Sequence, residues 1–138
     1  MAGIALSLVS CEVLGGSKGS PEDFGRLRQG LNDDRANLNR AAVENRLDRV
    51  AGILDTMRGR FDEIWSKSSA MNLLDRQHLA IQLASGRKML TSISQWTDSA
   101  DIDAVRSEVE TLNAVLNEID ILLDRTLRAM AGESESGL

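Results

Sequence analysis

Asp75 and His78 have the spacing in this chain that most resembles a metal site. An acidic residue and a histidine three positions apart lie on one face of a helix, as in helical bundles that hold metal ions between carboxylates. Such bundles need a second motif of this kind and further inward carboxylates. The chain has one histidine and one cysteine, which also excludes a Cys/His zinc site. We therefore expect His78 to be a surface residue, with no metal and no other cofactor.

Nucleophilic catalysis has equally little support. Cys11 is far from His78 in the sequence, and no third residue is placed to orient such a pair. Ser17 and Lys18 lack the glycine spacing and the preceding strand of a phosphate-binding loop. The formal charge of −5 disfavours nucleic-acid binding, which depends on a basic surface. The sequence thus predicts a protein that is not an enzyme and does not bind nucleic acid.

The first twenty residues differ from the rest of the chain. Residues 2–9 are uncharged and mostly apolar, and residues 15–20 form a glycine- and serine-rich tether with little to bury. Between them lies the tetrapeptide Leu8-Val9-Ser10-Cys11. It resembles the lipobox of bacterial lipoproteins, in which apolar and small residues precede the cysteine that receives the lipid.

The resemblance implies that residues 1–10 are a signal peptide and that Cys11 becomes the lipidated first residue, with residues 11–20 as a flexible tether. Two or more acyl chains hold a protein stably at a membrane. By the sorting rules of the family, Glu12 favours the outer over the inner membrane of a Gram-negative envelope. The alternative is that residues 4–9 pack as a short apolar segment and that Cys11 is a buried small side chain.

Beyond the tether, the sequence predicts helices. The chain is 42% hydrophobic and contains one proline, a composition that favours helices over strands and turns. Ser20 is expected to cap a helix that begins at Pro21. Apolar residues recur at steps of three and four over three segments, 33–67, about 70–96 and 98–131. Residues 21–67 form either one helix or two, because Gly30 and the polar residues 32–34 interrupt the pattern.

Two long amphipathic helices with a shorter one between them predict an elongated, antiparallel three-helix bundle. We expect an all-α, up-down-up bundle of coiled-coil character over residues 21–132, and a polar, disordered tail over 133–138. The turn between the last two helices is expected at 97–99, with the N-cap in the same segment.

The expected core follows the same periodicity. Its inward residues are Phe24, Leu27, Leu31, Leu38, Val43, Leu47, Val50, Leu54, Met57, Phe61, Ile64, Leu74, Ile81, Leu83, Leu90, Ile93, Trp96, Ile102, Val105, Val109, Leu112, Leu116, Ile119, Leu123 and Met130. Met71 and Met89 are expected to fill gaps in that core, and Trp65 and Trp96 to seal the ends of the bundle.

Charge is unevenly distributed along the chain. Residues 98–124 hold eight acids and one base, whereas residues 21–67 hold nine of each. The simpler interpretation is a solvated surface with weak ion pairs between helices. The alternative is an acidic face that binds a basic partner, formed by Glu108, Glu110, Glu118 and Asp120.

Together these features predict a lipid-anchored bacterial envelope protein that binds another protein through a helical face, as an adaptor or assembly module. The alternative is a cytosolic coiled-coil interaction protein, such as a secretion chaperone or a phage structural subunit. The same apolar stripe would also serve a homo-oligomer.

Overall fold

The structure is a computed structural model that describes residues 19–136, and within this range it is all-helical. The elements are α2 (Pro21–Val43), α3 (Leu47–Lys67), the short 3-10 helix η2 (Ser68–Ala70), α4 (Leu73–Asp98) and α5 (Ile102–Ser136). The all-α expectation is confirmed. The described range contains four α-helices where the sequence predicted three, because the segment 21–67 divides into two. Residues 1–18, including Cys11 and the lipobox-like tetrapeptide, lie outside the described residues.

The start of α2 follows the sequence prediction. Ser20 is the N-cap, its side chain accepts a hydrogen bond from the Asp23 backbone N–H, and the Asp23 carboxylate accepts one from the Ser20 N–H. This reciprocal pair is a capping box, and Pro21 occupies the first helical position. The Ser20 hydrogen bond is also the main reason that the pKa of Asp23 is lowered.

The break within 21–67 falls at residues 44–46, and neither Gly30 nor the polar residues 32–34 interrupt α2. Asn45 adopts a left-handed backbone conformation with φ of 56°, which asparagine tolerates better than most residues. Arg106 of α5 secures this turn, donating to the carbonyl oxygens of Ala42 and Val43 at 3.1 Å and to Asn45 Oδ1 at 2.6 Å. Arg106 thus binds the last carbonyl groups of α2, of which the Ala42 carbonyl oxygen also accepts the Asn45 backbone N–H at 3.3 Å.

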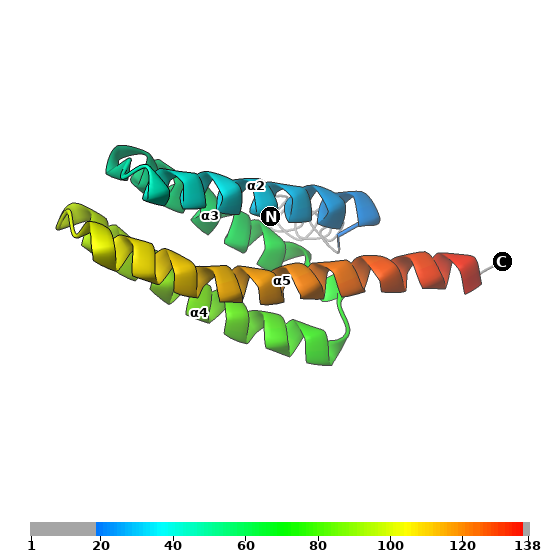
Figure 1. Ribbon diagram of the computed structural model, residues 1–138. Helices are drawn as coiled ribbons and strands as arrows, with labels where there is room; N and C mark the ends of the chain where they lie inside the picture. Colours follow the sequence, from blue (N-terminus) through cyan, green and yellow to red (C-terminus); the bar gives the residue numbers. More distant parts are fainter. Residues whose placement is uncertain (1–18, 137–138) are drawn as a thin grey trace, which may run out of the picture.

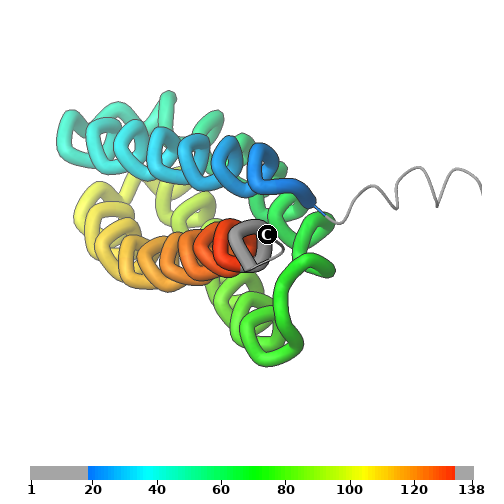
Figure 2. Tube along the Cα trace, turned by 90° about the vertical axis from the view of Figure 1, so that its right-hand side faces the viewer, coloured from blue at the N-terminus to red at the C-terminus, as the bar shows by residue number. Residues whose placement is uncertain are grey.

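The four helices form a closed ring in which each packs against the next, and α5 also packs against α2 (Figure 1). Contacts between neighbours join the beginning of one helix to the end of the other, as in Arg26–Glu63 for α2 and α3 and Asp75–Arg125 for α4 and α5. Neighbouring helices are thus antiparallel, and α4 lies across the bundle from α2. Figure 2 views the end at which α2 begins and α5 ends.

The core is almost entirely aliphatic, with Phe24 and Phe61 as its aromatic members. Every inward residue predicted on α3 from Val50 to Ile64 is buried, as is the predicted stripe of α5 from Val105 to Leu123. Met57 and Met71 are buried, and Met89 and Met130 pack against the core from its margin. Val43, at the end of α2, is 72% exposed and is not a core residue.

The prediction for α4 is partly wrong. Leu83, Leu90 and Ile93 are buried as expected, but Leu74, Ile81 and Trp96 are exposed. The inner face of α4 instead includes Leu79 and the small residue Gly86, so the true inward stripe holds fewer apolar side chains than the sequence suggested. The outward stripe is correspondingly apolar.

The boundaries of α4 and α5 also differ slightly from those predicted. Asn72 caps α4 by accepting the Asp75 N–H at 2.8 Å, and α4 runs to Asp98. The N-cap of α5 is Asp101, whose carboxylate accepts the Ala104 N–H at 3.1 Å, and not a residue of the segment 97–99. Ala100 in the connecting turn has φ of 56°, an uncommon conformation for a residue with a Cβ.

Candidate functional site

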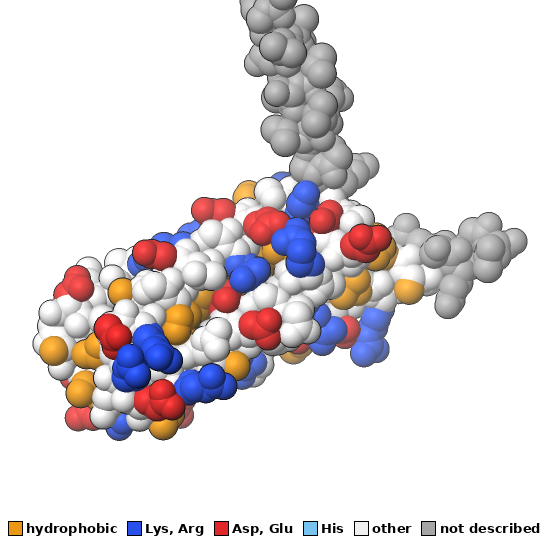
Figure 3. Space-filling view, turned by 90° about the horizontal axis from the view of Figure 1, so that it is seen from above, with side chains coloured by type: hydrophobic (Ala, Val, Ile, Leu, Met, Phe, Trp, Pro, Cys, Tyr) orange, Lys and Arg blue, Asp and Glu red, His pale blue; other side chains and the backbone are white. Residues whose placement is uncertain are grey.

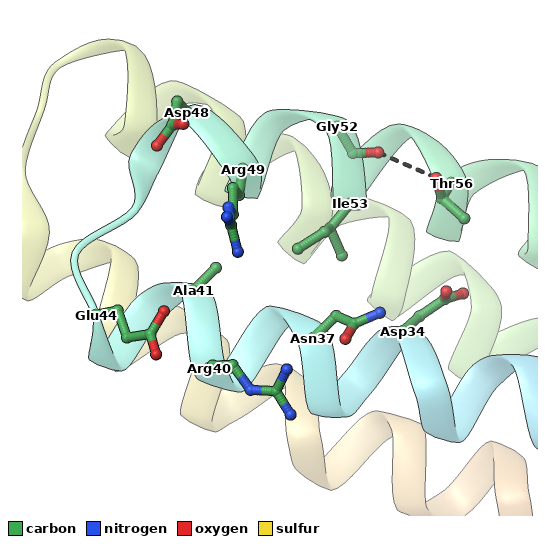
Figure 4. Close-up of a pocket in the computed structure, with 10 residues that line it drawn as sticks. All are labelled: Asp34, Asn37, Arg40, Ala41, Glu44, Asp48, Arg49, Gly52, Ile53 and Thr56. Carbon is green, nitrogen blue, oxygen red and sulfur yellow. Dashed lines mark hydrogen bonds between the residues drawn. The ribbon is translucent and has the colours of Figure 1, made fainter.

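A groove lies between the end of α2 and the beginning of α3 (Figure 4). It has a volume of about 440 Å³ and opens to solvent on one side. Its lining residues are Asp34, Asn37, Arg40, Ala41, Glu44, Asp48, Arg49, Gly52, Ile53 and Thr56. Both helices contribute, so the short turn at 44–46 determines the width of the groove.

Small residues leave this space open. Ala41 is buried at its base on α2, and Gly52 is an exposed part of the lining that α3 contributes. A Cβ atom built on Gly52 would meet no atom within 4 Å, so an ordinary side chain there would extend into open space. Ile53, half-buried beside Gly52, completes an apolar floor. Thr56 closes one end and donates its hydroxyl hydrogen to the Gly52 carbonyl oxygen at 3.1 Å (Figure 4).

Charged side chains surround that floor. Arg40 and Arg49 supply two bases and Glu44 an acid, and none of the three forms an ion pair with another described residue. Arg49 extends from α3 toward α2 across the groove (Figure 4). These three groups are therefore available to an external partner.

The other two acids of the groove are already paired. Asp48 accepts hydrogen bonds from Arg46 at 3.3 Å, and these bonds hold the pKa of Asp48 below its usual value. Asp34 is 6% exposed and binds the Arg60 guanidinium, with 2.7 Å between Nε and Oδ2. Asp34 is therefore buried, although it belongs to the polar segment 32–34. Its partner Arg60 lies directly against Gly30, where any Cβ would collide with the guanidinium.

The Asp75–His78 pair does not form a site. Asp75 is 7% exposed and points inward, where Arg125 donates to it at 2.7 Å, whereas His78 is on the surface. His78 Nε2 lies 3.7 Å from Glu118 Oε1 and 3.3 Å from the side-chain nitrogen of Gln82. Among the described side chains there is no group of three or more His, Cys, Asp or Glu residues that could hold a metal ion.

The four acids proposed as one partner-binding face are divided among several surfaces. Asp120 faces α2 and accepts from Arg28 at 2.7 Å, and Glu118 lies beside His78 of α4. Glu108 is half-buried, while Glu110 is fully on the outside. Arg28 also contacts Asp124 at 2.9 Å, and the hydrogen bond that Arg28 donates to Asp120 is the largest cause of the raised pKa of Arg28. Part of the acidic excess of α5 is thus neutralised within the bundle.

Figure 3 views the molecule from the side of α2, where acidic and basic side chains are interspersed. This mixture agrees with the equal numbers of acids and bases in residues 21–67. Sequence reasoning missed the groove because its lining comes from both sides of a turn whose position was not predicted. The signals available were the polar triplet Glu44-Asn45-Arg46 and the glycine at position 52.

No protein-family model, curated protein or solved structure matches this chain. None of the described helices has a stretch long and apolar enough to cross a membrane.

Proposed function

We propose that this chain is a lipid-anchored protein of the bacterial envelope that binds a partner protein in the groove between α2 and α3. The observation that carries the binding role is the arrangement of Arg40, Arg49 and Glu44, unpaired within the described chain, around the apolar floor of Ala41 and Ile53. Apolar contacts supply affinity, and charges at the rim select the partner and its orientation.

The partner that fits is a protein segment that carries one apolar side chain between an acidic and a basic residue. The acid would pair with Arg40 or Arg49, and the base with Glu44. A groove of this size accommodates a few side chains rather than a whole domain. The protein thus acts as an adaptor or assembly module and not as an enzyme.

The lipid anchor supports partner binding because it holds the protein at a membrane. The Leu8-Val9-Ser10-Cys11 tetrapeptide supplies an acylated cysteine, and residues 12–18 supply a short tether. Confining the bundle to a membrane surface raises its effective concentration near other proteins at the same membrane. Glu12 favours the outer membrane as the location.

The anchor is tested by metabolic labelling with an alkyne fatty acid, combined with mass spectrometry of the N-terminal peptide from native membranes. The wild-type chain should incorporate label and begin at Cys11, and Cys11→Ser should not label. A mature chain that retains residues 1–10 and an unmodified thiol would overturn the anchor.

The groove is tested by photo-crosslinking from position 52, with position 59 as the matched control. Both glycines are exposed residues of α3, and a Cβ at either meets no atom within 4 Å, but only Gly52 lines the groove. A crosslinked protein identified from position 52 and absent from position 59 is the expected result. Binding of that protein, once purified, should weaken with Gly52→Gln and remain unchanged with Gly59→Gln; the reverse order would exclude the groove.

The alternative function is a cytosolic coiled-coil interaction protein, such as a secretion chaperone or phage structural subunit. The exposed apolar residues Leu74 and Ile81 favour it, because assembly with other chains would cover them. Recovery in the soluble fraction with Met1 or Ala2 as the first residue would support this alternative over the lipoprotein.

A further inference from the structure

The outer face of α4 is the most apolar helical surface that the structure leaves exposed. Leu73, Leu74 and Ile81 are 69%, 76% and 65% exposed, and Ala80 and Ala84 lie beside them. Leu74, Ile81 and Lys88 are seven residues apart, so they form one line along the helix at intervals of about 10 Å. Exposed apolar rows of this kind mark contact surfaces.

The charge balance of α4 is opposite in sign to that of the whole protein. Among the described helices, α4 alone has more basic than acidic residues, although the chain carries a net charge of −5. Its acids are Asp75, which is buried against Arg125, and Asp98, which is its last residue. Residues 76–97 therefore contain bases and no acids. A helix face that combines apolar and basic residues is suited to an anionic membrane surface.

The bases are placed where lipid headgroups would lie. Arg87 and Lys88, with the hydroxyl groups of Thr91 and Ser92, line a shallow hollow beside Ala84. Cationic and hydroxyl groups together bind phosphate oxygens. Arg87 also contacts Asp62 of α3 at 2.9 Å, whereas Lys88 forms no ion pair with the described residues.

A second cation and an aromatic ring lie at the beginning of α4. The Arg76 guanidinium is 4.7 Å from the centre of the Trp65 ring and donates to Ser68 Oγ at 3.0 Å. Arg76 has no acidic partner among the residues that the structure describes. Tryptophan and arginine side chains are favoured at the boundary between lipid headgroups and acyl chains.

The described part of the chain begins at this same end. Gly19 lies against Lys67, the last residue of α3, and α4 begins six residues after Lys67 (Figure 2). Cys11 precedes Gly19 by eight residues, a separation of at most about 29 Å in an extended chain. This step rests on the proposed function, since it takes Cys11 as the anchored residue. An anchor on so short a tether keeps the start of α4 close to the bilayer.

We propose that the outer face of α4 lies on an anionic phospholipid bilayer. Leu73, Leu74 and Ile81 enter the boundary between headgroups and acyl chains, and Arg76 and Lys88 contact lipid phosphates. Because α2 lies across the bundle from α4, this orientation turns α2 and its side of the partner-binding groove away from the membrane.

The test uses the full-length Cys11→Ser chain, so that acyl chains make no contribution. Its co-sedimentation with vesicles of phosphatidylglycerol and phosphatidylcholine is compared with vesicles of phosphatidylcholine alone. We expect binding to the anionic vesicles that weakens with added salt. Replacing Leu74 and Ile81 together by glutamine should weaken it at least about tenfold, because two large apolar side chains no longer enter the lipid. Lys88→Gln should weaken it less.

The matched control is Ile121→Gln, which removes an apolar side chain that is 48% exposed on α5. It should bind vesicles as the parent chain does, and any contribution of residues 1–10 is identical in all the variants. Equal binding by the Leu74 and Ile81 double variant would overturn the membrane surface. So would concentration-dependent dimerisation that the double variant abolishes, because a second copy would then cover α4.

These outcomes are separate from those of the proposed function. Fatty-acid labelling and the N-terminal mass report the anchor, whereas vesicle binding by the Cys11→Ser chain reports α4 alone. If the wild-type chain is lipidated but the Cys11→Ser chain does not bind vesicles, the anchor is supported and membrane binding by α4 is excluded.

Discussion

Phe61 of α3 packs directly onto Gly86 of α4, so closely that a Cβ atom at position 86 would lie 2.8 Å from Cε2 of the ring. Phe61 is completely buried. The same Cβ atom would lie 3.5 Å from Cγ1 of Val115 on α5. The absence of a side chain at residue 86 thus allows three helices to meet around one aromatic ring.

Gly86→Ala is expected to lower the free energy of unfolding by about 1–3 kcal/mol, because the added methyl group forces the ring or the helix to move. Gly59→Ala is the matched control. Its Cβ meets nothing within 4 Å, and alanine favours a helix, so it should gain up to about 1 kcal/mol. Urea denaturation followed by circular dichroism measures both. Equal effects of the two substitutions would contradict the close contact.

Arg28 is expected to stabilise the contact between α2 and α5 by about 1 kcal/mol, the scale of a partly exposed pair. Its guanidinium binds Asp120 and Asp124 of α5. Arg28→Met should therefore lower the unfolding free energy at low salt and have a smaller effect at high salt. Glu110→Gln on the outside of α5 should change little. If Arg28→Met lowers the unfolding free energy equally at low and high salt, the aliphatic part of the Arg28 side chain stabilises the contact by packing instead.

Ala100→Gly is expected to stabilise the protein by about 0.5–1 kcal/mol. The left-handed conformation at φ of 56° costs an alanine more than a glycine, although glycine also gains freedom in the unfolded chain. The opposite result is expected for Ala36→Gly, an exposed position within α2, which should lose about 1 kcal/mol. The melting temperatures of the two variants measure the effect of replacing alanine by glycine in a left-handed turn and in a helix.

Stability is expected to fall as the pH decreases below about 5. The hydrogen bond from Arg26 lowers the pKa of Glu63, and the Ser20 and Arg46 contacts lower those of Asp23 and Asp48. A carboxyl group with a lower pKa in the folded state stabilises above its unfolded pKa, and this contribution disappears as pH falls through the folded pKa. Urea midpoints measured between about pH 6 and pH 3 test this. Glu63→Gln should flatten the acid part of the profile, and an unchanged profile would exclude the Arg26–Glu63 pair as a contributor.

The features predicted correctly from the sequence are those set by neighbours along the chain. The capping box at Ser20 needs only residues 20–23, and the stripe of α3 repeats so regularly that its inner face is unambiguous. The outer face of α4 was missed for the converse reason. Its inner stripe contains Gly86 and Asp75, so Leu74 and Ile81 on the opposite side made the wrong face look more apolar.

The groove and the helix break depend on residues distant in the sequence. Nothing near residues 44–46 indicates that Arg106 will bind the end of α2, since that contact spans more than sixty positions. The same holds for Asp34, whose partner Arg60 lies 26 positions later in the chain and is itself placed against Gly30. Patterns of neighbouring residues do not predict contacts between residues so far apart in the sequence.

The ring of helices closes only where α5, the last 35-residue helix, packs against α2, the first described one. Of the described helices α2 is synthesised first and α5 last, so a nascent chain that still lacks α5 leaves part of the apolar face of α2 without its partner.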